Sequence, residues 1–86
     1  MTERTVKIQL ENGLEARPVA MLVQKASMHD STIYLHAEGK RVNAKSIMGM
    51  MSLGLNMGED VKIEADGPDE AQAVERLERY LAGQEA

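Results

Sequence analysis

The sequence predicts an α+β fold in which a single β-sheet carries its helices on one face. Segments that alternate apolar and polar residues, as half-buried strands do, are interleaved with segments whose apolar residues recur at helical spacing. Their order is strand, helix, strand, strand, helix, strand, helix. Each helical segment has only one apolar face, so all the helices should cover the same side of the sheet. This combination favours a two-layer α+β sandwich.

Each predicted element has a local cause. The elements are a strand over residues 5–10, a helix over 16–27, strands over 32–37 and around Val42 joined by a Glu38-Gly39 turn, a helix over 47–53, a strand over 61–65 and a last helix after Asp69. Val6, Ile8 and Leu10 alternate with polar residues in the first strand. A turn at residues 66–68 ends the last strand, and we expect Asp69 to cap the helix that follows.

The composition limits the possible functions. With 86 residues the chain is long enough for one modest core, and we expect a single domain over residues 1–86. The formal net charge of -4 and an aromatic content of 2% argue against a general nucleic-acid binder. Without cysteine there is no disulfide or thiol nucleophile. No apolar run reaches membrane-spanning length and the first residues lack a secretory signal, so we expect a soluble, cytoplasmic protein.

The most informative segment runs from Val42 to Leu55 and places a serine at the start of a short methionine-rich helix. Ser46 is a candidate N-cap, because its hydroxyl can accept a hydrogen bond from the backbone N–H of Gly49. A phosphoryl group on that hydroxyl would add roughly 1.5 to 2 negative charges without melting the helix. The alternative is an ordinary capping serine. Lys45 is a candidate for partner recognition, whereas we expect Arg41 to serve solubility.

The seven methionines are many for a chain of this length. Methionine suits both irregular cores and adaptable binding surfaces, so core packing and a partner-binding edge both stay open. Ile47, Met48 and Met51 are too closely spaced to all point inward from a one-sided helix, so some must line an exposed edge. Met50 would then face elsewhere. We also expect the start of this helix and the start of the first helix to lie at one end of the sandwich.

Two segments carry a resemblance to a known family. They are residues 12–20, Asn-Gly-Leu-Glu-Ala-Arg-Pro-Val-Ala, and residues 45–53, Lys-Ser-Ile-Met-Gly-Met-Met-Ser-Leu. Both resemble the signature segments of HPr, the small phosphocarrier of the bacterial sugar phosphotransferase system, and the likeness runs over essentially the whole chain. The resemblance implies an open-faced β-sandwich, with a four-stranded antiparallel sheet of order 1-4-2-3 under three helices.

One position departs from the phosphocarrier pattern. The resemblance implies a histidine immediately before Ala-Arg-Pro, and this chain has Glu15 there. A carboxylate is a poorer nucleophile than a neutral imidazole, would form an acyl phosphate, and repels the incoming phosphoryl group. Glu15 therefore either stabilises the helix start, or permanently resembles a phosphorylated site and deters enzyme I, the phosphoryl donor. Arg17 either pairs with Glu15 or contacts a partner, and we expect His29 and His36 to be ordinary surface or sheet residues.

The missing histidine and the intact serine segment are similar to Crh, the catabolite-repression branch of the family, although that branch usually carries glutamine at the position of Glu15. The resemblance implies a non-enzymatic regulator without a cofactor. HPr kinase/phosphorylase would phosphorylate Ser46 with ATP, and the product would act as corepressor of the transcription factor CcpA. The expected partner-binding residues are Glu15, Arg17, Lys45, Ile47, Met48 and Met51.

Two other functions stay open. One is a phosphotransfer protein with an unusual acceptor, either Glu15 or a distant histidine, and the other is an interaction domain that no kinase modifies. Metal catalysis and nucleotide binding are not indicated, because the sequence has neither paired ligand spacing nor a phosphate-binding loop. An N-terminal edge strand with an Asn12-Gly13 hinge can exchange between two copies, and the resemblance to Crh, whose members form dimers, points the same way.

Overall fold

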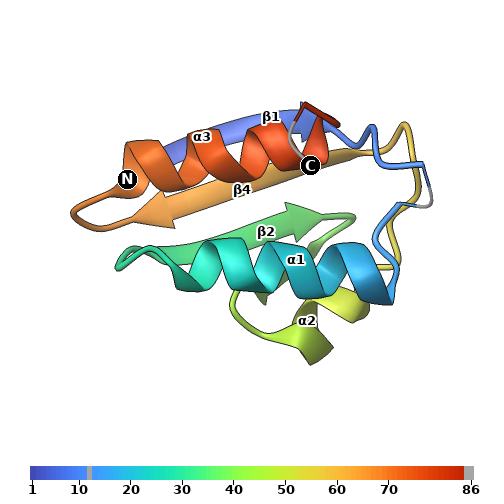
Figure 1. Cartoon of the computed structure of the whole chain (residues 1–86), viewed down its shortest axis with the longest axis horizontal. Coiled ribbons are helices and arrows are strands. Elements are labelled where there is room, and N and C mark those ends of the chain that lie inside the picture. Colours follow the sequence, from blue (N-terminus) through green and yellow to red (C-terminus); the bar gives the residue numbers. More distant parts are fainter. Residues whose placement is uncertain (12, 85–86) are drawn as a thin grey trace.

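The computed structural model describes residues 1–11 and 13–84. Its elements are β1 (Thr2–Lys7), α1 (Ala16–Ser27), β2 (Thr32–Ala37), β3 (Lys40–Asn43), α2 (Ile47–Met51), β4 (Asp60–Asp66) and α3 (Glu70–Leu81). The strands form one antiparallel sheet in the order β1-β4-β2-β3, with the helices on one face (Figure 1). The predicted sandwich, its element order and its sheet order are confirmed. None of the helices in these residues is long and apolar enough to span a bilayer.

The register of the sheet brings the alternating apolar residues together under the helices. Leu35 in β2 lies opposite Ile63 on one side and opposite Val42 on the other, so an apolar row crosses the sheet. Leu35 and Ile63 are fully buried, as are Leu22 of α1 and Leu77 of α3. Removal of these apolar side chains from water is the main force that holds the two layers together.

The first strand begins and ends earlier than the alternation predicts. β1 pairs with β4 from Thr2 to Lys7. Beyond the pairing, the Ile8 N–H donates to the carbonyl oxygen of Glu59, and the Gln9 N–H donates to that of Leu81. Ile8 is still buried, which explains why the apolar alternation continues although the backbone has left the sheet. The length of β1 is therefore set by its partner strand.

The start of β1 is fastened to α3 by side chains. The Thr2 hydroxyl donates to Glu70 at 2.6 Å, and the amino group of Met1 lies 2.9 Å from the same carboxylate. The Thr2 hydroxyl, the amino group and the Gly67 N–H together lower the pKa of Glu70 to about 2. The N-terminal strand is thus held by hydrogen bonds on its α3 side as well as by its pairing with β4.

Asp69 does not cap α3 with its side chain, and the predicted cap is wrong. It occupies the N-cap position, but its carboxylate makes no capping hydrogen bond. The carboxylate instead accepts from the hydroxyl and the N–H of Ser31, from the N–H of Asp30, and from Nδ1 of His29 at 2.8 Å. These bonds hold the pKa of Asp69 well below its usual range, and the bond from the Ser31 hydroxyl has the largest effect. Asp69 therefore ties the α1–β2 loop to the start of α3.

Candidate functional site

Ser46 lies between β3 and α2 and caps the helix that follows it. Its backbone is extended, and its hydroxyl oxygen accepts from the Gly49 N–H at 3.2 Å. The predicted cap is confirmed, although α2 ends at Met51, two residues before the predicted end. The side chain is half-buried. A hydroxyl has two lone pairs and a proton, so this cap leaves the Ser46 oxygen one lone pair and the proton for another partner.

Two lysine side chains flank the segment. The ammonium of Lys45 donates to the carbonyl oxygen of His29 at 2.8 Å, and that of Lys40 donates to the carbonyl oxygen of Ser52 at 3.2 Å, at the end of α2. Within residues 1–11 and 13–84, neither lysine pairs with a carboxylate. Both positive charges therefore stay available to an anionic group.

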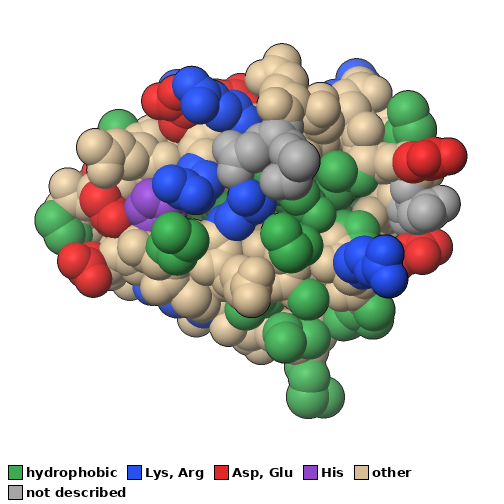
Figure 2. Space-filling view, viewed as in Figure 1, with side chains coloured by type: hydrophobic (Ala, Val, Ile, Leu, Met, Phe, Trp, Pro, Cys, Tyr) green, Lys and Arg blue, Asp and Glu red, His purple; other side chains and the backbone are tan. Residues whose placement is uncertain are grey.

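α2 exposes an apolar edge. Ile47 is 53% exposed, Met48 85% and Met51 44%, whereas Met50 is fully buried. Figure 2 shows hydrophobic side chains that gather over α2 and project from this side of the molecule. The predicted edge and the opposite orientation of Met50 are confirmed. Both roles left open for the methionines occur, since Met50 packs in the core and the others face solvent.

Glu15 and Arg17 open α1 with exposed side chains. The carbonyl oxygen of Glu15 accepts from the Val19 N–H at 2.9 Å, but its side chain makes no capping hydrogen bond. In the described part of the chain no ion pair joins Glu15 to Arg17, so the pairing offered as one role for Arg17 is not formed. The carboxylate and the guanidinium both face solvent.

The starts of α1 and α2 do not lie side by side, because the short helix α2 begins beside the middle of α1 (Figure 1), so the expectation that they share one end is not confirmed. α2 packs beside α1 and runs in the opposite direction (Figure 1). Lys45, just before α2, bonds to His29, just after α1, while Leu55, beyond α2, accepts from the Leu14 N–H before α1 at 2.9 Å. The cause is the β2–β3 hairpin, which returns the chain to the end where α1 stops.

We call the resulting area the α1–α2 surface. It comprises Glu15, Arg17, Lys45, Ser46, Ile47, Met48 and Met51. Its exposed apolar side chains lie on α2, directly after Ser46. A protein that contacts Ser46 therefore lies next to the apolar edge of α2.

Comparison with known proteins identifies the family. The sequence profile described as "PTS HPr component phosphorylation site" matches residues 2–83. The chain belongs to the HPr family. Its proteins are phosphocarriers and regulators rather than enzymes, and its fold is the sheet and helix arrangement described above.

Individual members of the HPr family match over nearly the full chain. The HPr-like protein Crh of Bacillus subtilis (strain 168) is 46% identical over 81 residues, which are 94% of this chain and 95% of the relative. The crystal structure of the phosphocarrier protein HPr from Bacillus anthracis has a TM-score of 0.91 at 42% identity and covers 93% of this chain and 95% of its own. A crystal structure of Crh from Bacillus subtilis is described as a domain-swapped dimer. It has a TM-score of 0.80 at 43% identity and covers 100% of this chain and 99% of its own.

Both histidines of this HPr-family chain are held by carboxylates. His29 follows α1 and is buried, and Nε2 of His36 in β2 lies 2.7 Å from Glu64. His36 lies in a strand as predicted, but the expectation that His29 is an ordinary surface residue is wrong, because its ring is buried and bonds to Asp69. The acidic partners are 40 and 28 residues away, so no local signal indicates them. Among the described residues no group of three potential ligands could hold a metal ion.

Arg41 has a structural role that the sequence did not indicate. Its guanidinium lies 3.7 Å from the centroid of the Tyr34 ring and 3.4 Å from Glu64. Burial raises the pKa of Glu64, but the hydrogen bond and charge of His36, with the charge of Arg41, outweigh burial and leave that pKa lowered. Arg41 therefore helps to hold the sheet face opposite the helices, and the expectation that it serves solubility alone is wrong.

Proposed function

We propose that this protein is a regulator of carbon catabolite repression in the cytoplasm, switched by phosphorylation of Ser46. HPr kinase/phosphorylase transfers the phosphoryl group, and the phosphorylated protein binds CcpA as a corepressor. The observation that carries the proposal is the half-buried Ser46 hydroxyl beside the exposed apolar edge of α2. The 46% identity to Crh of Bacillus subtilis supports it.

The transfer step uses the Ser46 hydroxyl as nucleophile. Its oxygen forms a bond to the γ-phosphorus of ATP, the bond from that phosphorus to the bridging oxygen of ADP breaks, and the hydroxyl proton passes to a base of the kinase. The product carries roughly 1.5 to 2 negative charges and three acceptor oxygens. Lys45 is the adjacent cation of the chain and can bind one of these oxygens once it leaves the His29 carbonyl.

The phosphate and the apolar edge have different tasks in partner binding. Met48 and Ile47 offer apolar area that a partner can cover, and methionine adapts to the shape of its surroundings. The phosphate adds charge-assisted hydrogen bonds to arginine or lysine side chains of CcpA. The unmodified protein offers only the apolar part, so its binding is weak. Phosphorylation acts as the switch because neither contribution suffices alone.

A kinase assay tests the proposal. Incubation with ATP and HPr kinase/phosphorylase should add the mass of one phosphoryl group to the wild type and none to Ser46→Ala. Ser27→Ala is the matched control, because Ser27 is exposed at the far end of α1, and it should be modified like the wild type. Equal modification of Ser46→Ala, or none of the wild type, would leave an interaction domain that no kinase modifies as the better description.

Binding to CcpA is tested separately. The phosphorylated protein should bind CcpA in a calorimetric titration, and the unmodified protein should bind at least tenfold more weakly, the effect of about 1.4 kcal/mol. Met48→Gln should weaken binding of the phosphorylated form. Met28→Gln is the control, because Met28 is 69% exposed but lies outside the α1–α2 surface. Equal binding of both forms would contradict the switch.

Phosphotransfer through another acceptor is the competing function. Glu15 is exposed, but its carboxylate is a weak nucleophile and repels the phosphoryl donor. Nδ1 of His29 is engaged by Asp69, and its Nε2 is buried. Incubation with phosphoenolpyruvate and enzyme I should therefore leave the mass unchanged. An adduct that hydroxylamine removes would assign an acyl phosphate at Glu15 and favour the competing function.

We also propose that β1 can exchange between two copies. β1 is an edge strand that pairs with β4, and Gly13, with φ +65°, follows it, while Asn12 of the suggested hinge lies outside the described residues. The swapped Crh dimer of Bacillus subtilis supports the exchange. Each copy would remake the Thr2–Glu70 bond with its partner. Size-exclusion chromatography with light scattering should show a slowly exchanging dimer, and a monomer at every concentration would contradict it.

A further inference from the structure

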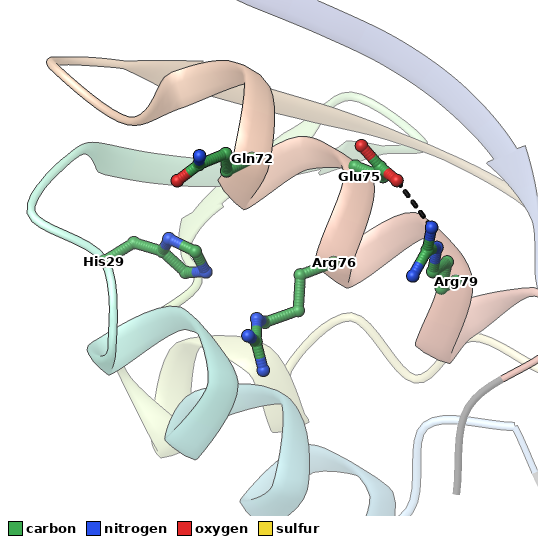
Figure 3. Close-up of a pocket in the computed structure, with 5 residues that line it drawn as sticks. All are labelled: His29, Gln72, Glu75, Arg76 and Arg79. Carbon is green, nitrogen blue, oxygen red and sulfur yellow. Dashed lines mark hydrogen bonds and ion pairs between the residues drawn. The ribbon is translucent and has the colours of Figure 1, made fainter.

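A polar pocket lies between the α1–β2 loop and α3, outside the α1–α2 surface. It has a volume of about 260 Å³ and is lined by His29, Gln72, Glu75, Arg76 and Arg79 (Figure 3). Gln72, Arg76 and Arg79 are spaced i, i+4, i+7 and so follow one side of α3. His29 faces them from the loop. Figure 2 shows a histidine beside basic side chains, lysine or arginine, on this face of the molecule.

The His29 ring has one nitrogen engaged and one without a partner. Nδ1 lies 2.8 Å from the carboxylate of Asp69, which accepts the hydrogen bond, so Nδ1 carries a proton. Nε2 is buried without a hydrogen-bond partner, and the side chain is only 9% exposed. A buried polar atom without a partner is costly, and one that faces a polar pocket indicates a missing ligand or water.

The pocket also holds uncompensated positive charge. Arg76 is half-buried, and in residues 1–11 and 13–84 it has neither an ion pair nor a hydrogen bond through its side chain. Arg79, by contrast, pairs with Glu75 at 2.7 Å. The pocket therefore contains one arginine side chain, that of Arg76, without an acidic partner among the described residues.

We propose that this pocket binds the phosphate group of a small molecule, either free phosphate or a phosphate monoester. Arg76 supplies the charge and several N–H donors, and the Gln72 amide and Nε2 of His29 supply donors from other directions. Donors that converge from several sides suit a tetrahedral oxyanion better than a planar carboxylate. Arg79 joins when the anion displaces Glu75. The site is independent of the function proposed for Ser46.

Two changes accompany binding. Nε2 is covered by protein atoms, so a ligand oxygen reaches it after a rotamer change of Gln72 and Arg76, which lie on either side of the ring (Figure 3). Nε2 then bonds the anion as an N–H donor, so the ring takes up one proton. The charged groups that face it are Asp69 before α3, Glu75, Arg76 and Arg79 on α3, and Lys45 at the His29 carbonyl.

An NMR titration of the full chain with phosphate, glycerol phosphate and acetate at constant ionic strength tests the site. Phosphate and glycerol phosphate should shift the ¹⁵N signal of His29 Nε2 saturably toward the protonated value, and acetate should not. Tighter binding of one phosphate compound assigns the free ion or the monoester. Arg76→Gln should weaken binding about tenfold, the loss of one charge-assisted partner. Glu75→Gln should tighten it severalfold, because it releases Arg79.

Matched controls separate the pocket from a general charge effect. Arg4 of β1 and Glu78 of α3 form a second ion pair, at 2.7 Å, outside the pocket. Arg4→Gln and Glu78→Gln change the net charge as Arg76→Gln and Glu75→Gln do, and both should leave phosphate binding unchanged. Amide spectra establish that each variant is folded. The proposal is overturned if the two pairs of variants have equal effects or if acetate binds as tightly as phosphate. It is also overturned if the ¹⁵N signal of His29 does not shift up to the highest phosphate concentration that is soluble.

Discussion

The ammonium of Lys45 and the carbonyl oxygen of His29 are joined by a hydrogen bond of 2.8 Å. This bond connects the residue beside Ser46 to the loop that carries the His29–Asp69 pair. A phosphoryl group on Ser46 would offer Lys45 a second acceptor with a full negative charge, which binds an ammonium more strongly than a carbonyl does. The α1–α2 surface and the α1–β2 loop therefore share one cation.

The first prediction concerns that cation. Lys45→Met should lower the free energy of unfolding by about 1–2 kcal/mol, because a half-buried bond to a charged donor is lost and the His29 carbonyl keeps no replacement. Urea denaturation measures the change. Lys7→Met is the control, since Lys7 makes a longer and exposed bond to Gly58 and should cost little. Equal losses in both variants would mean that the bond from Lys45 to His29 contributes no more to stability than the exposed bond of Lys7.

Truncation should destabilise the protein at Met50 but have little effect on stability at Met48. Met50→Ala removes a fully buried side chain and should cost about 2–5 kcal/mol in urea denaturation. Met48→Ala should stay within about 0.5 kcal/mol of the wild type, because Met48 is 85% exposed. A large loss at Met48 would contradict the assignment of this side chain to a partner-binding edge.

Substitution by alanine should stabilise the protein at one glycine and destabilise it at another. A Cβ at Gly49 would meet the Ser46 hydroxyl oxygen at 3.4 Å, an ordinary contact, so Gly49→Ala should raise the free energy of unfolding by about 0.5–1 kcal/mol through helix propensity. A Cβ at Gly13 would lie 2.4 Å from the Leu55 carbonyl oxygen, and Gly13 has φ +65°. Gly13→Ala should therefore destabilise by at least about 1–2 kcal/mol. Thermal unfolding of the pair checks both signs.

Acid should destabilise the wild type through Asp69. The pKa of this carboxyl is depressed in the folded state and about 3.9 in the unfolded state, so the stability that it contributes is present above about pH 4 and is lost as the pH falls through the folded-state pKa. Between about pH 5 and about pH 2.5, urea denaturation should show a larger loss for the wild type than for Asp69→Asn. Parallel losses would mean that Asp69 is not the group responsible.

Much of the fold could be predicted because its signals are local. Alternation indicated β2 and β4 correctly, and helical spacing indicated α1 to the residue at both ends. β1 was displaced because its length depends on pairing with β4, which the alternation of β1 itself does not encode. Asp69 was assigned as a side-chain cap from its position, yet its carboxylate oxygens accept hydrogen bonds from loop residues 38 to 40 positions earlier in the chain.

In the candidate site, too, the features with local signals could be predicted and those that depend on distant residues could not. The cap from Gly49 to Ser46 and the opposite faces of Met48 and Met50 followed from spacing within one helical turn. The antiparallel course of α1 and α2 did not, because it depends on where the β2–β3 hairpin returns the chain. The partners of His29 and His36 lie on other elements and could not be inferred from their neighbours.

The sequence by itself determined the order of strands and helices, the cap at Ser46 and the apolar edge beside it, because each depends on residues within about four positions of one another. Only the tertiary structure decided that α1 and α2 run in opposite directions, that Lys45 holds the His29 loop, and that Arg76 lines the same pocket as His29, whose Nε2 has no partner. These relationships join residues far apart in the chain, and the path of the backbone through the sheet sets the distances between them.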